Sequence, residues 1–210
     1  MTKINPNSNE ALIIVDIQND FCEGGALEVP EASKIIDKSN KVINRFDQVI
    51  LTQDWHPSDH ISFATQHKDK KPFDIINLDY GPQTLWPDHC IQGTIGAEFH
   101  NHLDTQSAKL IIRKGYNKNI DSYSAFYEND KYTSTGLKGY INEKKINKVF
   151  FIGLALDVCV KYSALDSINS GLETYVLKDL CKGLNKNSSN EALDIMEKSE
   201  IKIIDSSKFI

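Results

Sequence analysis

The sequence lacks the features of membrane, secreted and nucleic-acid-binding proteins. No apolar run approaches the roughly 18 to 20 residues needed to cross a bilayer, and the start Met1-Thr2-Lys3 has no apolar stretch like that of a signal peptide. Basic residues are too few to attract phosphates, because 24 basic side chains face 29 acidic ones and give a formal net charge of -5. We therefore expect a cytoplasmic protein that binds neither membranes nor nucleic acids.

Cysteine is also scarce. The chain has four, widely scattered along its length: Cys22, Cys90, Cys159 and Cys181. In a reducing compartment such cysteines are more often thiols or catalytic groups than a disulfide framework. Each must therefore be judged by its neighbours in the sequence.

The remaining composition is that of an ordinary globular protein. Hydrophobic residues make up 40% of the chain and charged residues 25%, and there is no internal repeat or low-complexity tract. A length of 210 residues suits one α/β domain with a full core, so we expect residues 1–210 to form a single domain. Whether the chain forms a homo-oligomer stays open at this point.

Short apolar runs alternate with segments of helical spacing. Several runs are apolar at consecutive positions and rich in β-branched and aromatic residues, as in parallel strands that are covered on both faces. Parallel neighbours need crossover connections, which are usually helices. The pattern predicts a three-layer α/β/α sandwich with a mainly parallel six-stranded sheet. The predicted strands are residues 11–17, 49–53, 109–114, 148–154, 174–177 and 201–204.

Helical spacing predicts three helices in particular. The first follows Pro30, which suits the first turn of a helix, and places its apolar side chains on one side. The second carries apolar residues at every fourth position over residues 160–168. The third begins with a capping box formed by Ser188 and Glu191.

A long segment of little periodicity, about residues 54–101, interrupts this alternation. It contains five of the six histidines and both tryptophans. A loop of this length in a compact domain is usually functional or disordered. The concentration of His, Trp and Pro favours a functional loop region.

Three chemically active residues lie at the ends of predicted strands. Asp16 is near the end of the first strand, Lys114 ends the third, and Cys159 follows the fourth. Open α/β sheets bind ligands beyond the carboxyl ends of their strands, so we expect these side chains to meet in one cleft. Taken singly, each has an ordinary structural explanation, as a turn residue, a solvated lysine and a small buried hydrophobic residue. Their joint placement favours a catalytic site.

These three residue types suit nucleophilic attack on an amide. A cysteine at the start of a helix has its thiolate stabilised by the helix dipole, and the Lys114 ammonium would add to this. Asp16 would take the thiol proton and later deliver it to a leaving amine. The sequence thus predicts a cysteine amide hydrolase that uses Cys159.

A second group of residues suits a divalent metal ion. In Asp54-Trp55-His56 a carboxylate and an imidazole lie on the same side of an extended segment, and His89 supplies a third ligand from a distant loop. Mixed oxygen and nitrogen donors suit Zn²⁺, Fe²⁺ or Mn²⁺ and do not choose among them. Of the three we expect Zn²⁺ first. His60 is an open fourth candidate. We expect the other histidines to be loop residues without a metal: His67, His100 and His102.

At these residues the chain resembles the nicotinamidase (pyrazinamidase) family of the isochorismatase-like cysteine hydrolases. The resemblance implies hydrolysis of nicotinamide to nicotinic acid and ammonia, a step of NAD salvage, and the same reaction on pyrazinamide. It also implies Asp16, Lys114 and Cys159 as the catalytic triad. The matching segments, in the family's order, are VDIQNDFCEGG at 15–25, QDWHPSDH at 53–60, WPDHC at 86–90, RKG at 113–115, DSYSAF at 121–126 and GLALDVCVK at 153–161.

The resemblance assigns further residues to the site. It implies an oxyanion hole formed by the backbone amides of Ala155 and Cys159, with a cis peptide bond before Ala155. Leu156 departs from the family, which commonly has Thr there, so a hydroxyl group is missing at this position. By resemblance the metal ligands are Asp54, His56 and His89, and the apolar walls of the substrate pocket are Phe21, Trp86 and Tyr123.

Two other functions are compatible with parts of this pattern. A carbamoyl-amide or ureido hydrolase of the same superfamily would keep the fold and the cysteine, but those relatives generally lack the metal ligands Asp54, His56 and His89. A metal-stabilised scaffold or binding protein without turnover would keep the metal site, and the replacement of Cys159 would then change nothing measurable.

Overall fold

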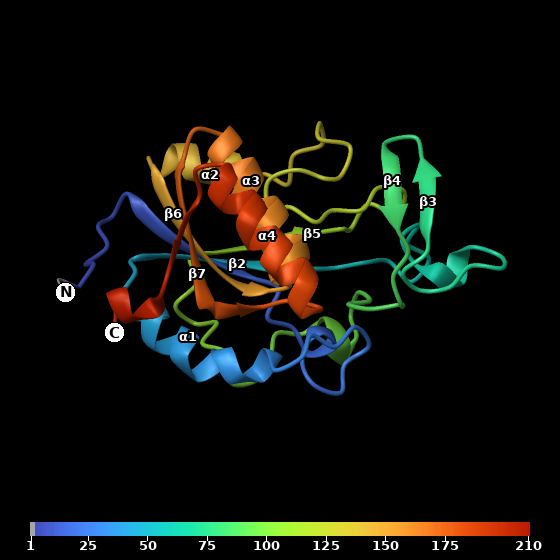
Figure 1. The fold of residues 1–210 in the computed structure, drawn as a ribbon, viewed down its shortest axis with the longest axis horizontal. Coiled ribbons are helices and arrows are strands. Elements are labelled where there is room, and N and C mark those ends of the chain that lie inside the picture. The colour runs from blue at the N-terminus through green and yellow to red at the C-terminus, as the bar shows by residue number, and fades with distance from the viewer. Residues whose placement is uncertain (1–2) are drawn as a thin grey trace.

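A six-stranded parallel sheet forms the centre of the computed structural model, which describes residues 3–210 (Figure 1). The strands lie in the order β5-β2-β1-β6-β7-β8, and every neighbouring pair is parallel. This confirms the predicted architecture. The strand bounds are β1 Glu10–Val15, β2 Gln48–Asp54, β5 Leu110–Lys114, β6 Lys148–Leu154, β7 Glu173–Lys182 and β8 Lys202–Ile204.

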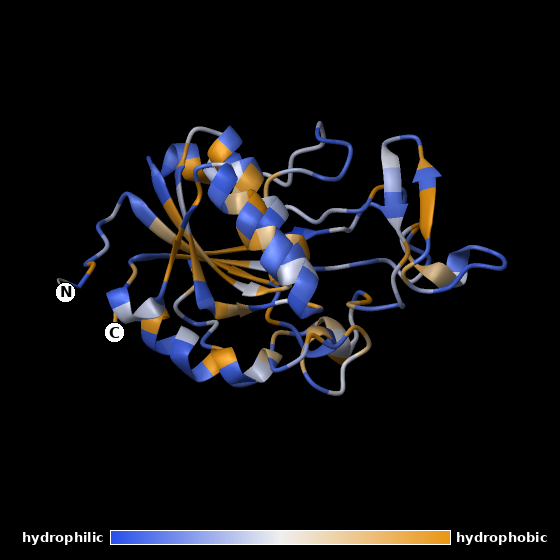
Figure 2. Cartoon of the chain, viewed as in Figure 1, coloured by the Kyte–Doolittle hydropathy of each residue, from blue (hydrophilic) through white to orange (hydrophobic). Residues whose placement is uncertain are grey.

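The central strands are apolar at consecutive positions because both faces of the sheet are covered. In β1, Leu12 and Ile14 point into one hydrophobic cluster, while Ile13 and Val15 point into the other. All four side chains are at most 1% exposed. Figure 2 shows these strands largely in orange between helices whose outer faces carry much blue. The alternation of side chains along a strand thus divides the core into two layers.

In the described part of the chain, four α-helices cover the two faces of the sheet. Side chains of α1 pack into one cluster, and side chains of α2, α3 and α4 pack into the other, so α1 lies on the opposite face of the sheet from the remaining three (Figure 1). None of the helices within residues 3–210 is long and apolar enough to cross a membrane. The bounds are α1 Ile36–Ile43, α2 Leu137–Glu143, α3 Lys161–Asn169 and α4 Lys186–Lys198.

The strand order places a crevice beside β1. From β1 the chain continues to β2 and β5 on one side, and β6, β7 and β8 lie on the other. The direction of winding therefore changes between β1 and β6, and in open α/β sheets ligands bind beyond the carboxyl ends of the strands at this point. Residues that follow β1, β2, β5 and β6 are thus brought to one edge of the sheet.

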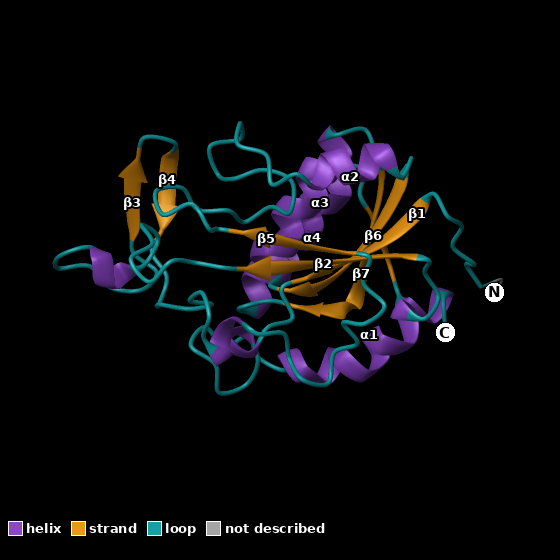
Figure 3. Cartoon of the chain, turned by 180° about the vertical axis from the view of Figure 1, so that it is seen from behind, coloured by secondary structure: helices purple, strands orange, loops and turns teal. Residues whose placement is uncertain are grey.

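A small antiparallel hairpin lies beyond the same edge, toward which the arrowheads of β2 and β5 point in Figure 3. It consists of β3 Ile75–Leu78 and β4 Gly81–Thr84, within the segment that we predicted to be a loop. Its strands are short, and β4 contains Pro82, which is unfavourable in most strands. This local composition explains why the sequence pattern did not reveal the hairpin.

The start of α4 differs from the prediction. The helix begins at Lys186, and its cap is Asn185, whose side-chain oxygen accepts a hydrogen bond from Ser188 N at 2.9 Å. The predicted capping box of Ser188 and Glu191 is therefore wrong. Asn185 has extended backbone angles and supplies the acceptor three residues earlier, so Ser188 lies inside the first turn.

Candidate active site and metal site

Asp16, Lys114 and Cys159 meet at the carboxyl edge of the sheet, although they are far apart in the sequence. Lys114 Nζ lies 2.8 Å from Asp16 Oδ2 and 3.4 Å from Cys159 Sγ. A carboxylate oxygen of Asp16 and the sulfur of Cys159 lie within 4.8 Å of one another. Asp16 and Lys114 are fully buried, and Cys159 is 6% exposed. One ammonium group thus contacts both a carboxylate and a thiol.

The local backbone fixes each of these side chains. Asp16 follows β1 with a left-handed φ of 47°, and Thr52 Oγ1 on β2 donates a hydrogen bond of 2.6 Å to Asp16 Oδ1. Cys159 lies in the π-helical turn Leu156–Val160 that follows β6. The peptide bond between Leu154 and Ala155, which enters this turn, is cis as the resemblance implied.

Lys114 also binds Asp54, so two carboxylates share one ammonium group. Lys114 Nζ donates at 2.6 Å to Asp54 Oδ1 and at 3.1 Å to the carbonyl oxygen of Ser122. Burial alone would lower the pKa of Lys114, but Asp16 and Asp54 hold it well above its ordinary value. Lys114 therefore stays charged inside the protein and serves as a fixed cation beside the sulfur.

The same surroundings shift the pKa values of the acid and the thiol. Burial raises the pKa of Asp16, and Lys114 offsets only part of this effect. Burial also raises the pKa of Cys159 well above its ordinary value, with Asp16 and Asp54 adding to the rise. The thiol therefore keeps its proton at rest, and an acceptor such as Asp16 is needed to remove it.

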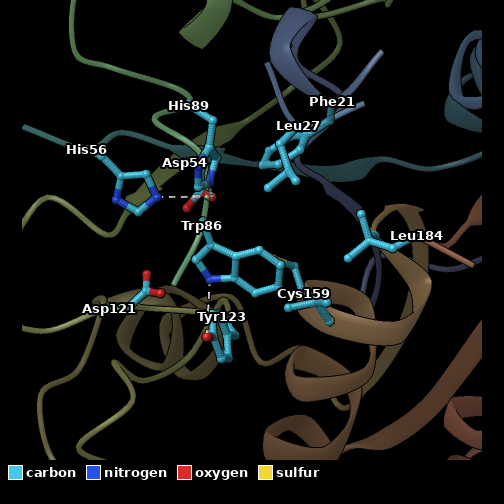
Figure 4. A pocket seen from close by; sticks show the side chains of 12 residues that line it. Phe21, Leu27, Asp54, His56, Trp86, His89, Asp121, Tyr123, Cys159 and Leu184 are labelled. Atoms are coloured by element: carbon cyan, nitrogen blue, oxygen red, sulfur yellow. Dashed lines mark hydrogen bonds and ion pairs between the residues drawn. The ribbon is translucent and has the colours of Figure 1, made fainter. Parts of the chain in front are cut away.

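Asp54, His56 and His89 form a compact group next to these residues. Asp54 Oδ2 lies 3.3 Å from His56 Nε2 and 3.6 Å from His89 Nε2, and all three residues are buried. Figure 4 shows both imidazoles turned toward Asp54. Burial alone would raise the pKa of Asp54, yet Lys114 and His56 hold it well below its usual range. Asp54 is thus a carboxylate that faces two ring nitrogens.

The hydrogen bonds of these histidines fit a metal ion. His56 Nδ1 lies 2.8 Å from the carbonyl oxygen of Gly115, and His89 Nδ1 lies 2.7 Å from that of Pro87. Because a carbonyl oxygen only accepts, each Nδ1 must donate, which leaves each neutral ring with a lone pair on Nε2. Among the described residues, His56 Nε2 has no hydrogen-bond partner. A metal cation could be coordinated by these two Nε2 atoms together with the carboxylate of Asp54.

His60 is placed differently from the other candidate ligands. One ligand atom each from His60, His56 and Asp121 lie within 4.8 Å of one another. His60 does not belong to the group formed by Asp54, His56 and His89. Its Nδ1 lies 2.7 Å from Ser62 Oγ, and its Nε2 lies 3.3 Å from the carbonyl oxygen of Ile120. Both ring nitrogens of His60 are therefore engaged by the protein itself.

Cys159 and the metal group face a common pocket, which we name the inner pocket (Figure 4). Most of its walls are apolar or aromatic side chains, as in most small-molecule sites, so it suits a ligand with an apolar ring. The predicted walls Phe21, Trp86 and Tyr123 all line it. The full lining is Phe21, Leu27, Asp54, His56, Trp86, His89, Asp121, Tyr123, Ala155, Val158, Cys159 and Leu184.

Comparison with known proteins places this architecture. A family model described as the isochorismatase domain matches residues 10–208. The nicotinamidase of Acinetobacter baylyi is 53% identical over 182 residues, which cover 87% of this chain and 85% of that protein. The chain belongs to the isochorismatase family. The resemblance found in the sequence is thereby confirmed.

Solved structures of the isochorismatase family agree with this placement. A nicotinamidase and pyrazinamidase from Acinetobacter baumanii has a TM-score of 0.94 and 50% identity, and the match covers 96% of this chain and 98% of that one. A pyrazinamidase from Pyrococcus horikoshii in complex with zinc has a TM-score of 0.77 and 36% identity, with coverage of 94% and 99%. The fold is therefore that of family members over nearly their whole length.

The sequence did not single out the polar network behind Tyr123. Gln83 Nε2 on β4 donates to Asp121 Oδ2 at 2.8 Å and to Tyr123 Oη at 2.9 Å, and Trp86 Nε1 lies 3.3 Å from the same hydroxyl. Through these bonds the hairpin positions two walls of the inner pocket. Asp121 lies in a segment that matches the family, which is a usable signal, whereas Gln83 lies in none of the matching segments.

Proposed function

We propose that this protein is a nicotinamidase, which hydrolyses nicotinamide to nicotinic acid and ammonia and acts on pyrazinamide in the same way. The observation that carries the proposal is the buried Lys114 ammonium, which contacts the sulfur of Cys159 and the carboxylates of Asp16 and Asp54 beside two metal-competent imidazoles. The proposal is also supported by the 53% sequence identity between this chain and a nicotinamidase. The small, mostly apolar inner pocket suits a single aromatic ring.

In the first half of the reaction Asp16 takes the thiol proton of Cys159, and the sulfur attacks the carboxamide carbon. Lys114 stabilises the thiolate while it exists. The backbone amides of Ala155 and Cys159 hold the oxyanion of the tetrahedral intermediate. The carbon–nitrogen bond then breaks as Asp16 delivers its proton to the leaving nitrogen, so ammonia leaves and a thioester remains.

The second half restores the enzyme. Asp16, again ionised, takes a proton from a water molecule that attacks the thioester carbon. The carbon–sulfur bond breaks, nicotinic acid is released, and Asp16 returns the proton to the sulfur of Cys159. Phe21, Trp86 and Tyr123 enclose the ring during both halves and keep bulk water from the thioester.

We further propose that Asp54, His56 and His89 hold one divalent ion, with Zn²⁺ as the first candidate because a relative has been solved with zinc. When bound, such an ion supplies a Lewis-acidic anchor for a ring nitrogen. Three protein ligands leave coordination positions open, as is common in catalytic metal sites. The support for His60 as a fourth ligand is weaker, because both of its ring nitrogens already have partners.

The test of the proposed reaction is ammonia release from nicotinamide by the purified, metal-analysed protein, with an N-carbamoyl compound as the competing substrate. Cys159→Ala should abolish ammonia release and leave the metal content unchanged, because nucleophile and ligands come from different segments. Cys181→Ala is the matched control, since it removes a buried thiol that does not line the inner pocket. Full activity of Cys159→Ala would contradict the proposal.

The test of the metal proposal is metal analysis of two histidine variants. His56→Ala should lose the metal and most of the turnover, because it removes a buried donor with a free Nε2. His102→Ala should keep both, since His102 is exposed and belongs to no metal-competent group among residues 3–210. Stoichiometric metal in His56→Ala would remove His56 from the ligand set.

A further inference from the structure

A second cavity adjoins the inner pocket and shares part of its lining. We name it the outer cavity; it has an empty volume of about 730 Å³ and shares Leu27, Trp86, Val158 and Leu184 with the inner pocket. Phe73, 60% exposed, lines the outer cavity but not the inner pocket, and it meets the Trp86 ring edge-on at a centroid distance of 6.0 Å. Four apolar side chains therefore lie between the two spaces.

Leu184 is held in this wall by a buried carboxylate. Asp157, which is 5% exposed and lies in the same π-helical turn as Cys159, accepts hydrogen bonds from Leu184 N at 3.0 and 3.2 Å and a short one from Ser188 Oγ. A Cβ atom added at the neighbouring Gly183 would lie 3.0 Å from Asp157 Oδ1, so the two segments are in close contact. The turn of the nucleophile thus fixes the position of Leu184.

Leu184 also lies at the end of the inner pocket that faces away from the metal group. In Figure 4 it stands across the pocket from His56, with Trp86 and Cys159 between them. A substrate ring held between the metal group and Cys159 therefore has Leu184 toward the end that faces away from the metal group. Shortening this side chain would open the inner pocket toward the outer cavity, whose surface is mostly apolar.

We propose that Leu184 determines which aromatic carboxamides are accepted, by excluding those that carry an apolar substituent on the ring, and that Asp157 is the positioning residue that holds it there. The inference rests on the proposed function and adds a specificity determinant to it. A substituent that passed Leu184 would enter the outer cavity, whose surface is mostly apolar although polar side chains also line it: Glu28, Asp157, Asn185 and Ser188. The exclusion is therefore steric, and a smaller side chain should remove it.

The experiment compares kcat and KM for ammonia release from nicotinamide and from nicotinamides with one ethyl group at each free ring carbon. The wild-type protein should prefer nicotinamide to every ethyl compound. In Leu184→Ala the ratio of kcat/KM for at least one ethyl compound to that for nicotinamide should rise about tenfold or more, the scale on which pocket contacts of this size act. Asp157→Asn should move the same ratio in the same direction and raise KM for nicotinamide more than it lowers kcat.

Two further variants complete the design. Leu193→Ala makes the same truncation on α4, outside both cavities, and should leave the ratio unchanged. Leu184→Phe enlarges the half-buried side chain, which should sharpen the rejection of the ethyl compounds, and it tests the idea independently if Leu184→Ala does not fold.

The outcomes distinguish a failure of the role of Leu184 from a failure of the proposed function. An unchanged ratio in Leu184→Ala and Leu184→Phe, with nicotinamide turnover intact, overturns the role of Leu184 and leaves the proposed function standing. An unchanged ratio in Asp157→Asn alone overturns the role of Asp157. No ammonia from nicotinamide with the metal-loaded wild-type protein overturns the proposed function itself.

Discussion

Asp16 combines an unusual backbone conformation with the proposed role of proton acceptor. Its φ of 47° is left-handed, a region that Asn tolerates better than most residues, so Asp16→Asn should preserve the fold. The amide cannot take the proton of Cys159. We therefore expect kcat to fall by about 10²- to 10⁴-fold, the usual contribution of general acid–base catalysis, with little change in Tm. Steady-state ammonia release and a thermal melt measure both, and near-normal turnover would exclude Asp16 as the base.

Glu128 is a buried carboxyl group in the segment that carries Tyr123. It is 2% exposed, and Asn117 Nδ2 donates to its Oε2 at 3.3 Å. Burial raises the pKa of Glu128 from 4.5 to about 7. The folded state therefore binds the proton more tightly than the unfolded state, and the contribution of Glu128 to stability is greatest below pH 4.5 and is lost as the pH rises toward 7.

The predicted consequence is a difference between the wild-type protein and Glu128→Gln. The variant keeps the shape of the side chain but cannot ionise, so its Tm should exceed that of the wild type by a growing margin as the pH rises from 5 to about 8. Thermal melts across this range, with fixed metal and salt, measure the difference. Parallel Tm curves for the two proteins would show that Glu128 does not titrate in this window.

Individual site residues differ in how far the sequence could reveal them. Asp16, Lys114 and Cys159 were predictable, because the end of a parallel strand is a position that can be found from the apolar pattern alone. Leu184 and Gln83 were not, because an apolar residue in a loop and an amide in a short strand have no distinctive pattern. Their places depend on contacts with Asp157 and Asp121 that form only in the folded chain.

At the scale of elements, the strands of the main sheet were predictable and those of the small hairpin were not. All six strands of the main sheet were found, because their apolar runs are short and rich in β-branched and aromatic residues. β7 extends to Lys182, beyond the predicted end at residue 177. Asp179 interrupts the apolar pattern there, and it is stabilised by tertiary contacts with Ser206 and Lys38, which the local sequence cannot show.

The turn after β5 connects backbone conformation to the metal group. Gly115 has a φ of +65°, and a Cβ atom there would lie 2.3 Å from His56 Cε1. Gly115→Ala should therefore displace the imidazole, and we expect at least a tenfold loss of metal affinity, on the scale of losses seen when a partner that orients a ligand is removed. Metal titration of the purified variant measures it.

Gly171→Ala is the control for this prediction. Gly171 has a similar φ of +84°, but an added Cβ would have no atom within 4 Å. It should lose stability through backbone strain and keep its metal affinity. Equal metal affinities in the two variants would show that Gly115 does not support His56.

At the scale of the whole molecule, the hydrophobic core and the metal group occupy different regions. The two hydrophobic clusters lie against the faces of the sheet, whereas the metal group lies beyond its carboxyl edge. Removal of the metal by a chelator should therefore abolish turnover but leave a cooperatively folded protein. The Tm of the metal-free protein should be lower by about 5 to 10 °C than that of the protein in a free metal concentration of about 100 times the Kd for the metal. Calorimetry before and after restoring the ion measures this, and a non-cooperative melt of the chelated protein would contradict it.

Asp54 divides its carboxylate between two neighbours, with Oδ1 on the ammonium of Lys114 and Oδ2 toward His56 and His89. In evolutionary terms, one residue thus links the metal ligands to Lys114, the cation beside the nucleophile, so that both are affected by a single substitution. A lineage that lost this aspartate would leave Lys114 with one of its two carboxylate partners, Asp16. Descendants without the ion should therefore carry compensating changes around the lysine, and not only at the histidines.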